Sequence, residues 1–492
     1  MTANLASLFL ARAELRPELR LGVVDDQHRI DEAVDRAQVI AGDLAAAGLE
    51  PGDRLGVVGG TSTGYLIFWL GCQLAGVQPA LVNPTYPGDL LAPMLAALAP
   101  AAVATPDGEC PAWPGHSLGF GDVLSSPLRS NGRALPGKPA ASLPGTDRHE
   151  LDVAGYMHTS GTTGLPKFCA QSHRYYLRLG RLVADELSLC PADRVLAPLP
   201  MFHINPLGYG FLGSLTGLAD VLGMSRFSAS AFWPTVRELG VTTLILHAPP
   251  VEILKRRTTP ADASGHRVRA MFYADEVFLE TYDVPLAMSG YGSTEVGGLS
   301  HVWQWRRGER PGIPEGIGHV GGRPRQDVEH RLTDTGEILV RAREPETMFS
   351  GYVRDGEVVP AVDTDGWFHT GDLGRHDDEG RLVFIERAAD SIRVKGEFVP
   401  IDHVETTFAR IAAFKDLALW KRAGNLRDDE VVLYVVADEV PAEEVRAHSA
   451  SLPGFMRPTA IARVEAIPRD AGAGKVQRRN LDEDAVIEWV PC

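Results

Sequence analysis

The feature that most constrains the fold is the string TSGTTGLPK, which spans Thr159–Lys167 and holds four hydroxyl side chains, two glycines and one lysine. Glycines allow the backbone to approach a ligand closely. Hydroxyls and free N–H groups donate hydrogen bonds to phosphate oxygens, and a lysine adds a positive charge. The string therefore predicts a loop wrapped around a polyphosphate, with a plain surface loop as the alternative. It is not a Walker A loop, because the spacing GxxxxGK followed by Ser or Thr is absent.

The length of 492 residues is sufficient for two or three domains, and the 44% hydrophobic and 23% charged residues are typical of a globular protein. The net charge of −16 argues against nucleic acid or an anionic membrane as the main partner. The five scattered cysteines form no C-x-x-C pair, which fits a reduced cytoplasmic protein without structural zinc. We also find no signal peptide and no apolar stretch of about 20 residues. A cytoplasmic monomer or homodimer without membrane insertion is expected.

The first hundred residues alternate helix and strand patterns. Apolar residues recur at helical spacing from Val34 to Leu44, and Gly48 is placed to end that helix. Repeated units of this kind predict a mostly parallel sheet covered by helices. Strands are predicted at Arg54–Val58, Pro79–Val82 and Ala101–Ala104, and helices at Thr63–Ala75 and Asp89–Leu98.

The rest of the chain changes character twice. Residues 107–148 are rich in Pro, Gly and Ser and predict a long surface connection. The patterns between about residue 311 and residue 387 indicate a smaller β-rich subdomain, and the tail indicates a compact α+β domain. We therefore predict an α/β domain at 1–387 and a small α+β domain at 388–492. The supporting strands are Asp220–Met224, Val241–His247, Glu337–Arg341, Arg381–Glu386, Val431–Ala437 and Ile461–Val464, with a helix at Ala442–Ser451.

Three further strings carry chemistry. In Tyr291–Glu295, YGSTE, the aromatic ring can stack on a base, while a hydroxyl and a carboxylate can hold phosphate and Mg²⁺. A turn before a helix is the alternative. Gly366–Gly374 reads GWFHTGDLG, in which Asp372 alone would be an ordinary turn residue. Arg469–Lys475, RDAGAGK, is a glycine-rich loop that ends in lysine and is a weak signal alone.

These four strings, in this order and over almost the entire chain, resemble the adenylate-forming superfamily of acyl-CoA synthetases, stand-alone adenylation domains and luciferases. The resemblance implies a large N-terminal domain, a hinge near residues 387–390 and a small mobile lid domain. It also implies a two-step reaction with ATP and Mg²⁺. A carboxylate attacks the α-phosphorus of ATP and releases pyrophosphate, and a second nucleophile then attacks the activated carbonyl.

The resemblance also implies roles for individual residues. Tyr291 lines the adenine, Thr294 contacts the α-phosphate, and Glu295 binds Mg²⁺, while Gly292 belongs to the nucleotide-binding residues. The residues implied to hold the phosphates are Thr159, Ser160, Gly161, Thr162, Thr163, Gly164 and Lys167.

The remaining implied roles fall near the C-terminal end of the chain. Asp372 accepts hydrogen bonds from both ribose hydroxyls, and Arg387 reaches ribose or phosphate, with a surface ion pair as its alternative. Lys475 stabilises the charge that develops as pyrophosphate leaves.

The sequence departs from the family pattern in three places. The usual G-G-A adenine loop is replaced by Met271–Glu276, MFYADE, so that Ala274 and Asp275 are expected at the nucleotide. Alanine stands at the hinge position Ala389. The loop that ends in Lys475 is one residue longer than usual. Gly396 is retained in the loop that a pantetheine arm passes. These changes leave adenylation intact but weaken the assumption that coenzyme A is the acceptor.

The segment Pro200–Pro206, PMFHINP, matches the family's P-x-x-H segment. His203 is expected to bind a carboxylate or shield the reaction from water, and an ordinary buried histidine is the alternative. The aspartate that amino-acid-activating members use here is absent. A flat aryl or enoyl acid is preferred, because room beside Tyr209 and Phe211 is expected at three glycines, Gly208, Gly210 and Gly213.

The leading interpretation is an ATP-dependent acid–thiol ligase with coenzyme A as acceptor. The alternatives are an enzyme that loads a carrier protein, forms an amide or activates nitrite for an arylamine, and a nucleotide-binding protein without activity. A simple hydrolase is not favoured.

Overall fold

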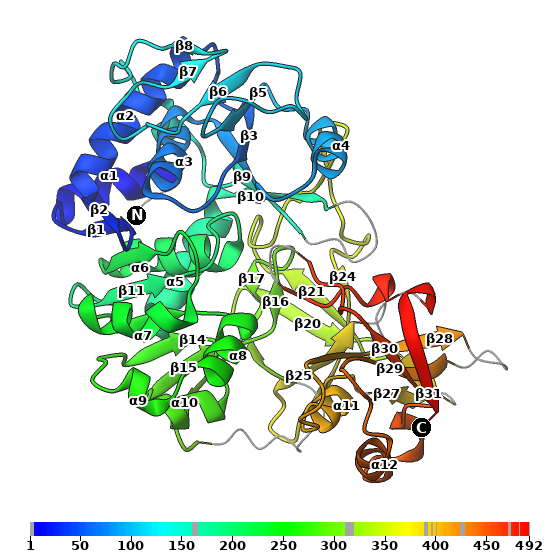
Figure 1. Ribbon diagram of the computed structural model, residues 1–492. Helices are drawn as coiled ribbons and strands as arrows, with labels where there is room; N and C mark the ends of the chain where they lie inside the picture. The colour runs from blue at the N-terminus through cyan, green and yellow to red at the C-terminus, as the bar shows by residue number, and fades with distance from the viewer. Residues whose placement is uncertain are drawn as a thin grey trace. The chain divides into compact units, whose positions relative to one another are not determined.

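The computed structural model describes residues 4–159, 166–309, 319–387, 392–394, 397–399, 401–423, 429–470, 474–481 and 483–491 (Figure 1). Its contacts divide the chain into two compact units. The first comprises Met1–Arg310, Pro324–Glu329 and Arg341–Phe368, and the second comprises Pro311–Arg323, His330–Val340 and His369–Cys492. The predicted domain boundary at residue 388 lies outside the described residues and stays a prediction.

Ten strands of the first unit form one mixed sheet in the order β23-β22-β10-β9-β4-β3-β5-β6-β7-β8 among the described residues. Its centre is parallel, because β3 pairs in parallel with both β4 and β5, and β4 with β9. Their bounds are β3 Arg54–Val58, β4 Gln78–Val82, β5 Ala102–Thr105, β6 Ser117–Gly119, β7 Arg129–Ser130, β8 Arg133–Ala134, β9 Val153–His158, β10 Phe168–Ser172, β22 Gly351–Arg354 and β23 Glu357–Val359.

Eight further strands of the first unit follow the order β2-β1-β12-β11-β13-β14-β15-β18. The run from β1 to β15 is parallel, and antiparallel strands stand at both ends. Their bounds are β1 Arg20–Val23, β2 Asp26–Arg29, β11 Arg194–Ala197, β12 Asp220–Gly223, β13 Thr243–Ile245, β14 Ala270–Phe272, β15 Leu286–Ser289 and β18 His301–Arg306.

Helices cover both sheets, because the apolar side chains of the strands are buried against the apolar sides of helices. One core joins Leu55 and Val57 of β3 with Val195 of β11 and the apolar sides of α1, α2, α3 and α5, so these helices lie between the sheets. The opposite face of the eight-stranded region packs on α7, α8 and α10 (Figure 1). The helices are α1 Leu5–Leu15, α2 Ile30–Ala46, α3 Thr63–Ala75, α4 Gly88–Leu98, α5 His173–Glu186, α6 Gly213–Gly217, α7 Ala229–Glu238, α8 Ala248–Arg257, α9 Pro260–Ala263 and α10 Glu276–Tyr282.

The predicted helices and strands of the first hundred residues are confirmed to within one residue at most ends. Helix α2 buries Val34, Ala37 and Leu44 on one side, and it is followed by Gly48 with a φ of 86°. Glycine adopts this left-handed conformation without the steric penalty of a side chain. Helices α3 and α5 each begin after a serine, Ser62 and Ser172, whose side chain accepts a backbone N–H of the first turn.

The second unit contains β-rich segments followed by an α+β tail. Strands β19 His319–Pro324, β25 Leu382–Arg387, β24 Phe368–His376, β21 Glu337–Ala342 and β20 Val328–Leu332 are neighbours in that order. Near the C-terminal end, α11 Ile401–Phe408 and α12 Ala442–Ala450 share a core with a four-stranded sheet. That sheet consists of β28 Asp416–Ala423, β29 Asp429–Val436, β30 Ala460–Val464 and β31 Val486–Pro491, and a separate pair is formed by β26 Ile392–Val394 and β27 Glu397–Val399.

Two expectations need correction. Residues 107–148 are not only a surface connection, because β6, β7 and β8 extend the ten-stranded sheet and bury Leu118 and Leu128. The glycines of the π-helix Asn205–Leu212 do not leave room for a substrate. A Cβ on Gly210 would lie 2.6 Å from the Cβ of Ala197, and one on Gly208 would lie 2.9 Å from Leu179. One on Gly213, which follows the π-helix, would touch Val183. These glycines instead allow close packing.

We expect G210A to destabilise the first unit by about 1–3 kcal/mol, because the added methyl group overlaps Ala197 on a rigid strand. Urea unfolding monitored by tryptophan fluorescence measures the change. The matched control is G60A, at an exposed glycine whose Cβ would meet nothing within 4 Å. Equal unfolding midpoints for G210A and G60A would show that the space beside Gly210 is open after all.

Candidate active site

The predicted phosphate loop connects two antiparallel strands of the ten-stranded sheet. β9 ends at His158, β10 begins at Phe168, and these two residues are cross-strand partners. The backbone N–H of Thr159 donates to the carbonyl of Lys167 at 2.9 Å, which closes the base of the loop. The residues between them that were predicted to hold phosphate lie outside the described residues, namely Ser160, Gly161, Thr162, Thr163 and Gly164.

The YGSTE string forms a hairpin rather than a turn before a helix. Strands β16 Gly292–Ser293 and β17 Gly298–Leu299 pair with Gly292 opposite Leu299. A Cβ on Gly292 would lie 1.9 Å from the carbonyl oxygen of Gly298, so only glycine permits this approach. The buried Tyr175 of α5 donates its hydroxyl to the carbonyl of Thr294 at 2.8 Å. The backbone that carries Tyr291, Thr294 and Glu295 is therefore held from two sides.

Tyr352 of β22 brings the phosphate-loop lysine and the predicted metal carboxylate together. Its hydroxyl donates to Oε1 of Glu295 at 3.0 Å, and Nζ of Lys167 lies 5.1 Å from the centre of its ring. The backbone N–H of Phe349 also donates to the carbonyl of Glu295 at 3.1 Å. Tyr352 lies outside the sequence motifs that predicted the site. Its only local signal is the preceding Gly351, whose φ of 149° is rare for other residues.

His203 lies beside a second histidine at the start of the phosphate loop. The ring of His158 is 6.2 Å from that of His203 and 6.1 Å from that of Phe202. Nδ1 of His158 is 3.3 Å from the hydroxyl of Tyr86. Burial, together with the nearby His203, lowers the pKa of His158 to about 3. His158, directly before Thr159, is therefore a neutral imidazole. Its position next to the phosphate loop is the sequence signal that could have identified it.

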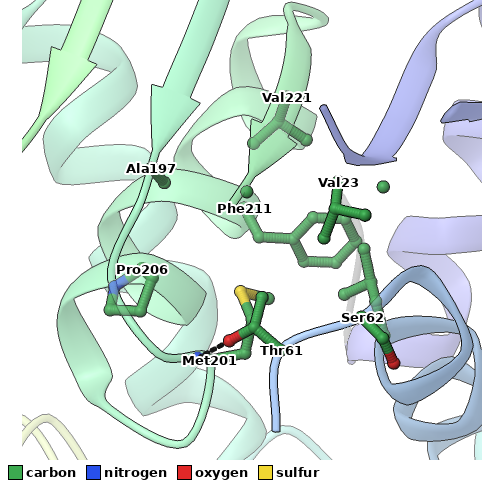
Figure 2. Close-up of a pocket in the computed structure, with 11 residues that line it drawn as sticks. Val23, Thr61, Ser62, Ala197, Met201, Pro206, Phe211 and Val221 are labelled. Atoms are coloured by element: carbon green, nitrogen blue, oxygen red, sulfur yellow. Dashed lines mark hydrogen bonds between the residues drawn. The ribbon is translucent and has the colours of Figure 1, made fainter. Parts of the chain in front are cut away.

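A small apolar cavity lies next to the same segment (Figure 2). Met201 and Pro206 line it together with Phe211, and the backbone N–H of Met201 donates to the hydroxyl of Thr61 at 2.9 Å. Its volume is about 10 Å³, the space of one water molecule. The cavity as it stands is thus too small for an aryl or enoyl acid.

The loop expected at the adenine has an unusual backbone. Tyr273 adopts a φ of 60°, which is strained for a bulky residue. Its ring stacks on that of His247 with centroids 5.3 Å apart and planes 9° apart. Ala274 is buried. Asp275 accepts the N–H of Phe278 at 2.7 Å as the N-cap of α10 and pairs with Lys255, so its carboxylate has structural partners. Nucleotide roles for Ala274 and Asp275 stay predictions.

In the second unit, the two residues predicted to reach the ribose are neighbours. Asp372 of β24 and Arg387 of β25 are direct cross-strand partners. Asp372 is buried, and its N–H donates to the hydroxyl of Thr370 at 3.1 Å. Glu337 accepts the N–H of Gly371 at 3.1 Å and so supports the turn before Asp372. Gly396, predicted to face a pantetheine arm, lies outside the described residues.

Lys475 is exposed at the end of a short loop in the second unit. The backbone N–H of Asp470 donates to the carbonyl of Lys475 at 2.9 Å, and Arg469 forms a β-bridge with Val476. The N–H of Lys475 lies 3.3 Å from the carboxylate of Asp470. These contacts hold the loop at its base and leave the lysine side chain exposed.

The sequence of residues 18–353 matches the family model described as AMP-binding enzyme. The chain therefore belongs to the AMP-binding enzyme family, as the resemblance to adenylate-forming enzymes predicted. The crotonobetaine/carnitine–CoA ligase of Proteus mirabilis is 29% identical over 354 residues, which cover 67% of this chain and 66% of that protein. The corresponding ligase of Escherichia coli O157:H7 is 30% identical over 351 residues with the same coverage. The chain thus spans just under two thirds of the length of these relatives.

Solved structures share the fold over nearly the whole chain. The o-succinylbenzoate CoA synthetase of Bacillus subtilis, in complex with its acyl-adenylate intermediate, has a TM-score of 0.83 and 22% identity, covering 97% of this chain and 98% of that chain. ATP-bound MatB of Rhodopseudomonas palustris has a TM-score of 0.76 and 21% identity, covering 98% and 99%. The predicted fold class is confirmed.

The described residues lack two features, a helix that could span a membrane and a cluster of metal-binding side chains. No helix in the described part of the chain has the length and apolar character needed to cross a bilayer. The same residues contain no cluster of three or more His, Cys, Asp or Glu side chains suited to a metal ion.

We expect the stability of the protein to fall as the pH drops from 6.5 towards 3, because the unfolded chain then binds a proton that buried His158 does not. For H158F this contribution disappears. The loss of unfolding free energy between pH 7 and pH 5 should be smaller than in the wild type by about 2 kcal/mol. Urea unfolding at both pH values measures it, with H149F at an exposed histidine as control. An unchanged pH dependence in H158F would contradict the neutral, buried state of His158.

Proposed function

We propose that this protein is an AMP-forming acid–thiol ligase. It adenylates a carboxylate with ATP, releases pyrophosphate, and transfers the acyl group to a thiol, for which coenzyme A is the leading candidate. Membership of the AMP-binding enzyme family and the likeness to crotonobetaine/carnitine–CoA ligases support this function. The single observation that carries it is the arrangement of Lys167 and Glu295 around one tyrosine.

The residues present fit a magnesium nucleotide. The hydroxyl of Tyr352 donates a hydrogen bond to Oε1 of Glu295. Within the described residues Oε2 has no hydrogen-bond partner. One carboxylate oxygen is therefore available to a cation. A bound Mg²⁺ would neutralise phosphate charge. Lys167 binds the phosphates as a point charge, and Thr294 donates its hydroxyl to the α-phosphate. A solved relative from Bacillus subtilis carries ATP and a magnesium ion.

The other predicted residues complete the proposal. His203 orients the carboxylate of the acid, with His158 packed against it as a neutral ring. Asp372 and Arg387 hold the ribose, and Lys475 stabilises the charge that develops during adenylation. Gly396 lets the pantetheine arm pass to the activated carbonyl. The four cysteines of the described residues are free thiols, which supports a cytoplasmic site of action.

The function is tested by the products formed. With ATP, Mg²⁺, coenzyme A and a panel of aryl and enoyl acids, we expect AMP and an acyl-CoA thioester in equal amounts, measured by chromatography. The active-site control is E295Q, which keeps the side-chain shape and removes its charge. Parallel reactions contain an amine, a carrier protein, or nitrite with an arylamine in place of coenzyme A. AMP formation that requires one of these acceptors and not coenzyme A would overturn the thiol-ligase assignment.

We expect K475A to lower the rate of adenylate formation by about 100- to 1,000-fold, because the positive charge of Lys475 acts mainly in the transition state. ATP affinity should change little. Pyrophosphate exchange measures the rate, and calorimetry measures ATP binding. The matched control is K415A, another exposed lysine of the second unit, which pairs with Asp438 at 2.6 Å. Pyrophosphate exchange as fast in K475A as in K415A would remove Lys475 from the reaction.

A further inference from the structure

The geometry points to Tyr352 as a positioning residue that aims the Glu295 carboxylate at the divalent cation and keeps it apart from the Lys167 ammonium. This role rests on the proposed function, and none of the sequence motifs includes Tyr352. Three features of the structure support this role: the backbone of Tyr352 is fixed, its hydroxyl restrains Glu295, and its ring faces Lys167.

The position of Tyr352 is fixed on both edges of its strand. It pairs with Cys169 of β10 on one side and with Val359 of β23 on the other. A Cβ on the preceding Gly351 would lie 2.3 Å from the carbonyl oxygen of Val359, so glycine is required for this close pairing. Because a paired strand resists displacement, the phenol ring starts from a rigid backbone.

Glu295 is restrained at two points by neighbouring residues of one segment. Phe349 donates its N–H to the Glu295 carbonyl at 3.1 Å, and Tyr352 donates its hydroxyl to Oε1 at 3.0 Å. The backbone contact sets where the residue sits, and the hydroxyl contact sets the rotation of the carboxylate. Rotation matters because Mg²⁺ demands nearly octahedral geometry with short oxygen distances. Oε1 of Glu295 is thus held by Tyr352, and Oε2 is left to bind the cation.

The ring of Tyr352 contacts the side chain of Lys167. With Nζ 5.1 Å from the ring centre, Lys167 makes a cation–π contact that leaves its full positive charge. The described residues contain no ion pair between Lys167 and a carboxylate. A direct Lys167–Glu295 pair would use the two charges that the phosphates and the cation require. A neutral phenol that contacts both groups prevents this pairing and keeps both groups in place.

The test separates the hydroxyl from the ring. Y352F keeps the ring over Lys167 and removes the hydrogen bond to Glu295, whereas Y352L removes both. The matched control is Y156F in strand β9 of the same sheet, a buried tyrosine whose hydroxyl donates to the neutral side chain of Gln78 at 2.7 Å. Circular dichroism and thermal unfolding verify that each full-length variant is folded.

The readout is equilibrium binding of Mn²⁺ followed by electron paramagnetic resonance, with a non-hydrolysable ATP analogue at saturation. We expect Y352F to weaken Mn²⁺ binding about tenfold, as loss of a hydrogen bond to a charged group implies. Its affinity for the metal-free analogue should stay within about twofold of wild type, since Lys167 keeps its ring contact. Y352L should weaken binding of the metal-free analogue as well, and Y156F should match wild type. In E295Q, adding Y352F should cause no further loss, because the two residues act as one unit.

Wild-type Mn²⁺ affinity in Y352F would overturn the role of Tyr352, and so would fully additive effects of Y352F and E295Q. These outcomes leave the proposed function standing if wild type still exchanges pyrophosphate in the presence of an acid. A wild-type protein that neither binds the analogue nor exchanges pyrophosphate would instead overturn the proposed function, and the role of Tyr352 with it.

Discussion

The pairing of β22 with β10 is the interaction on which the candidate site of the first unit depends. β10 follows the phosphate loop directly, and β22 belongs to a segment almost two hundred residues further along the chain. Their ladder places Tyr352 opposite Cys169, two residues after Lys167, and brings Phe349 to the backbone of Glu295. Without this strand pairing, Lys167, Glu295 and Tyr352 would not be held next to one another.

Close approach of backbones is the second recurring constraint, and glycine satisfies it. Gly292 meets the carbonyl of Gly298 in the YGSTE hairpin, and Gly351 meets that of Val359 beside Tyr352. At each place a side chain would collide with backbone, which cannot move aside as a flexible side chain can. The helix glycines Gly208 and Gly210 obey the same rule against Leu179 and Ala197, although their sequence context suggested a substrate pocket.

The electrostatics of the site rest on neutral groups placed between charged or titratable ones. Burial keeps His158 neutral next to His203, and the phenol of Tyr352 separates Lys167 from Glu295. A direct ion pair between Lys167 and Glu295 would use the charges that the magnesium nucleotide needs. The neutral phenol between Lys167 and Glu295 therefore preserves the two charges that the proposed chemistry uses.

The sequence by itself determined the α/β pattern, nearly every strand and helix that it predicted, and the family, because periodicity and short motifs are local properties of the chain. It also placed Asp372 and Arg387 at positions that the structure shows to be cross-strand partners. Only the tertiary structure decided that Tyr352 belongs to the site, since its hydrogen bond reaches across 57 residues to Glu295. Only the tertiary structure also decided the role of Gly210. A glycine in a sequence does not show whether the space beside its Cα is empty or filled by other residues. Neighbours distant in the chain settle that question, and a local pattern contains no information about them.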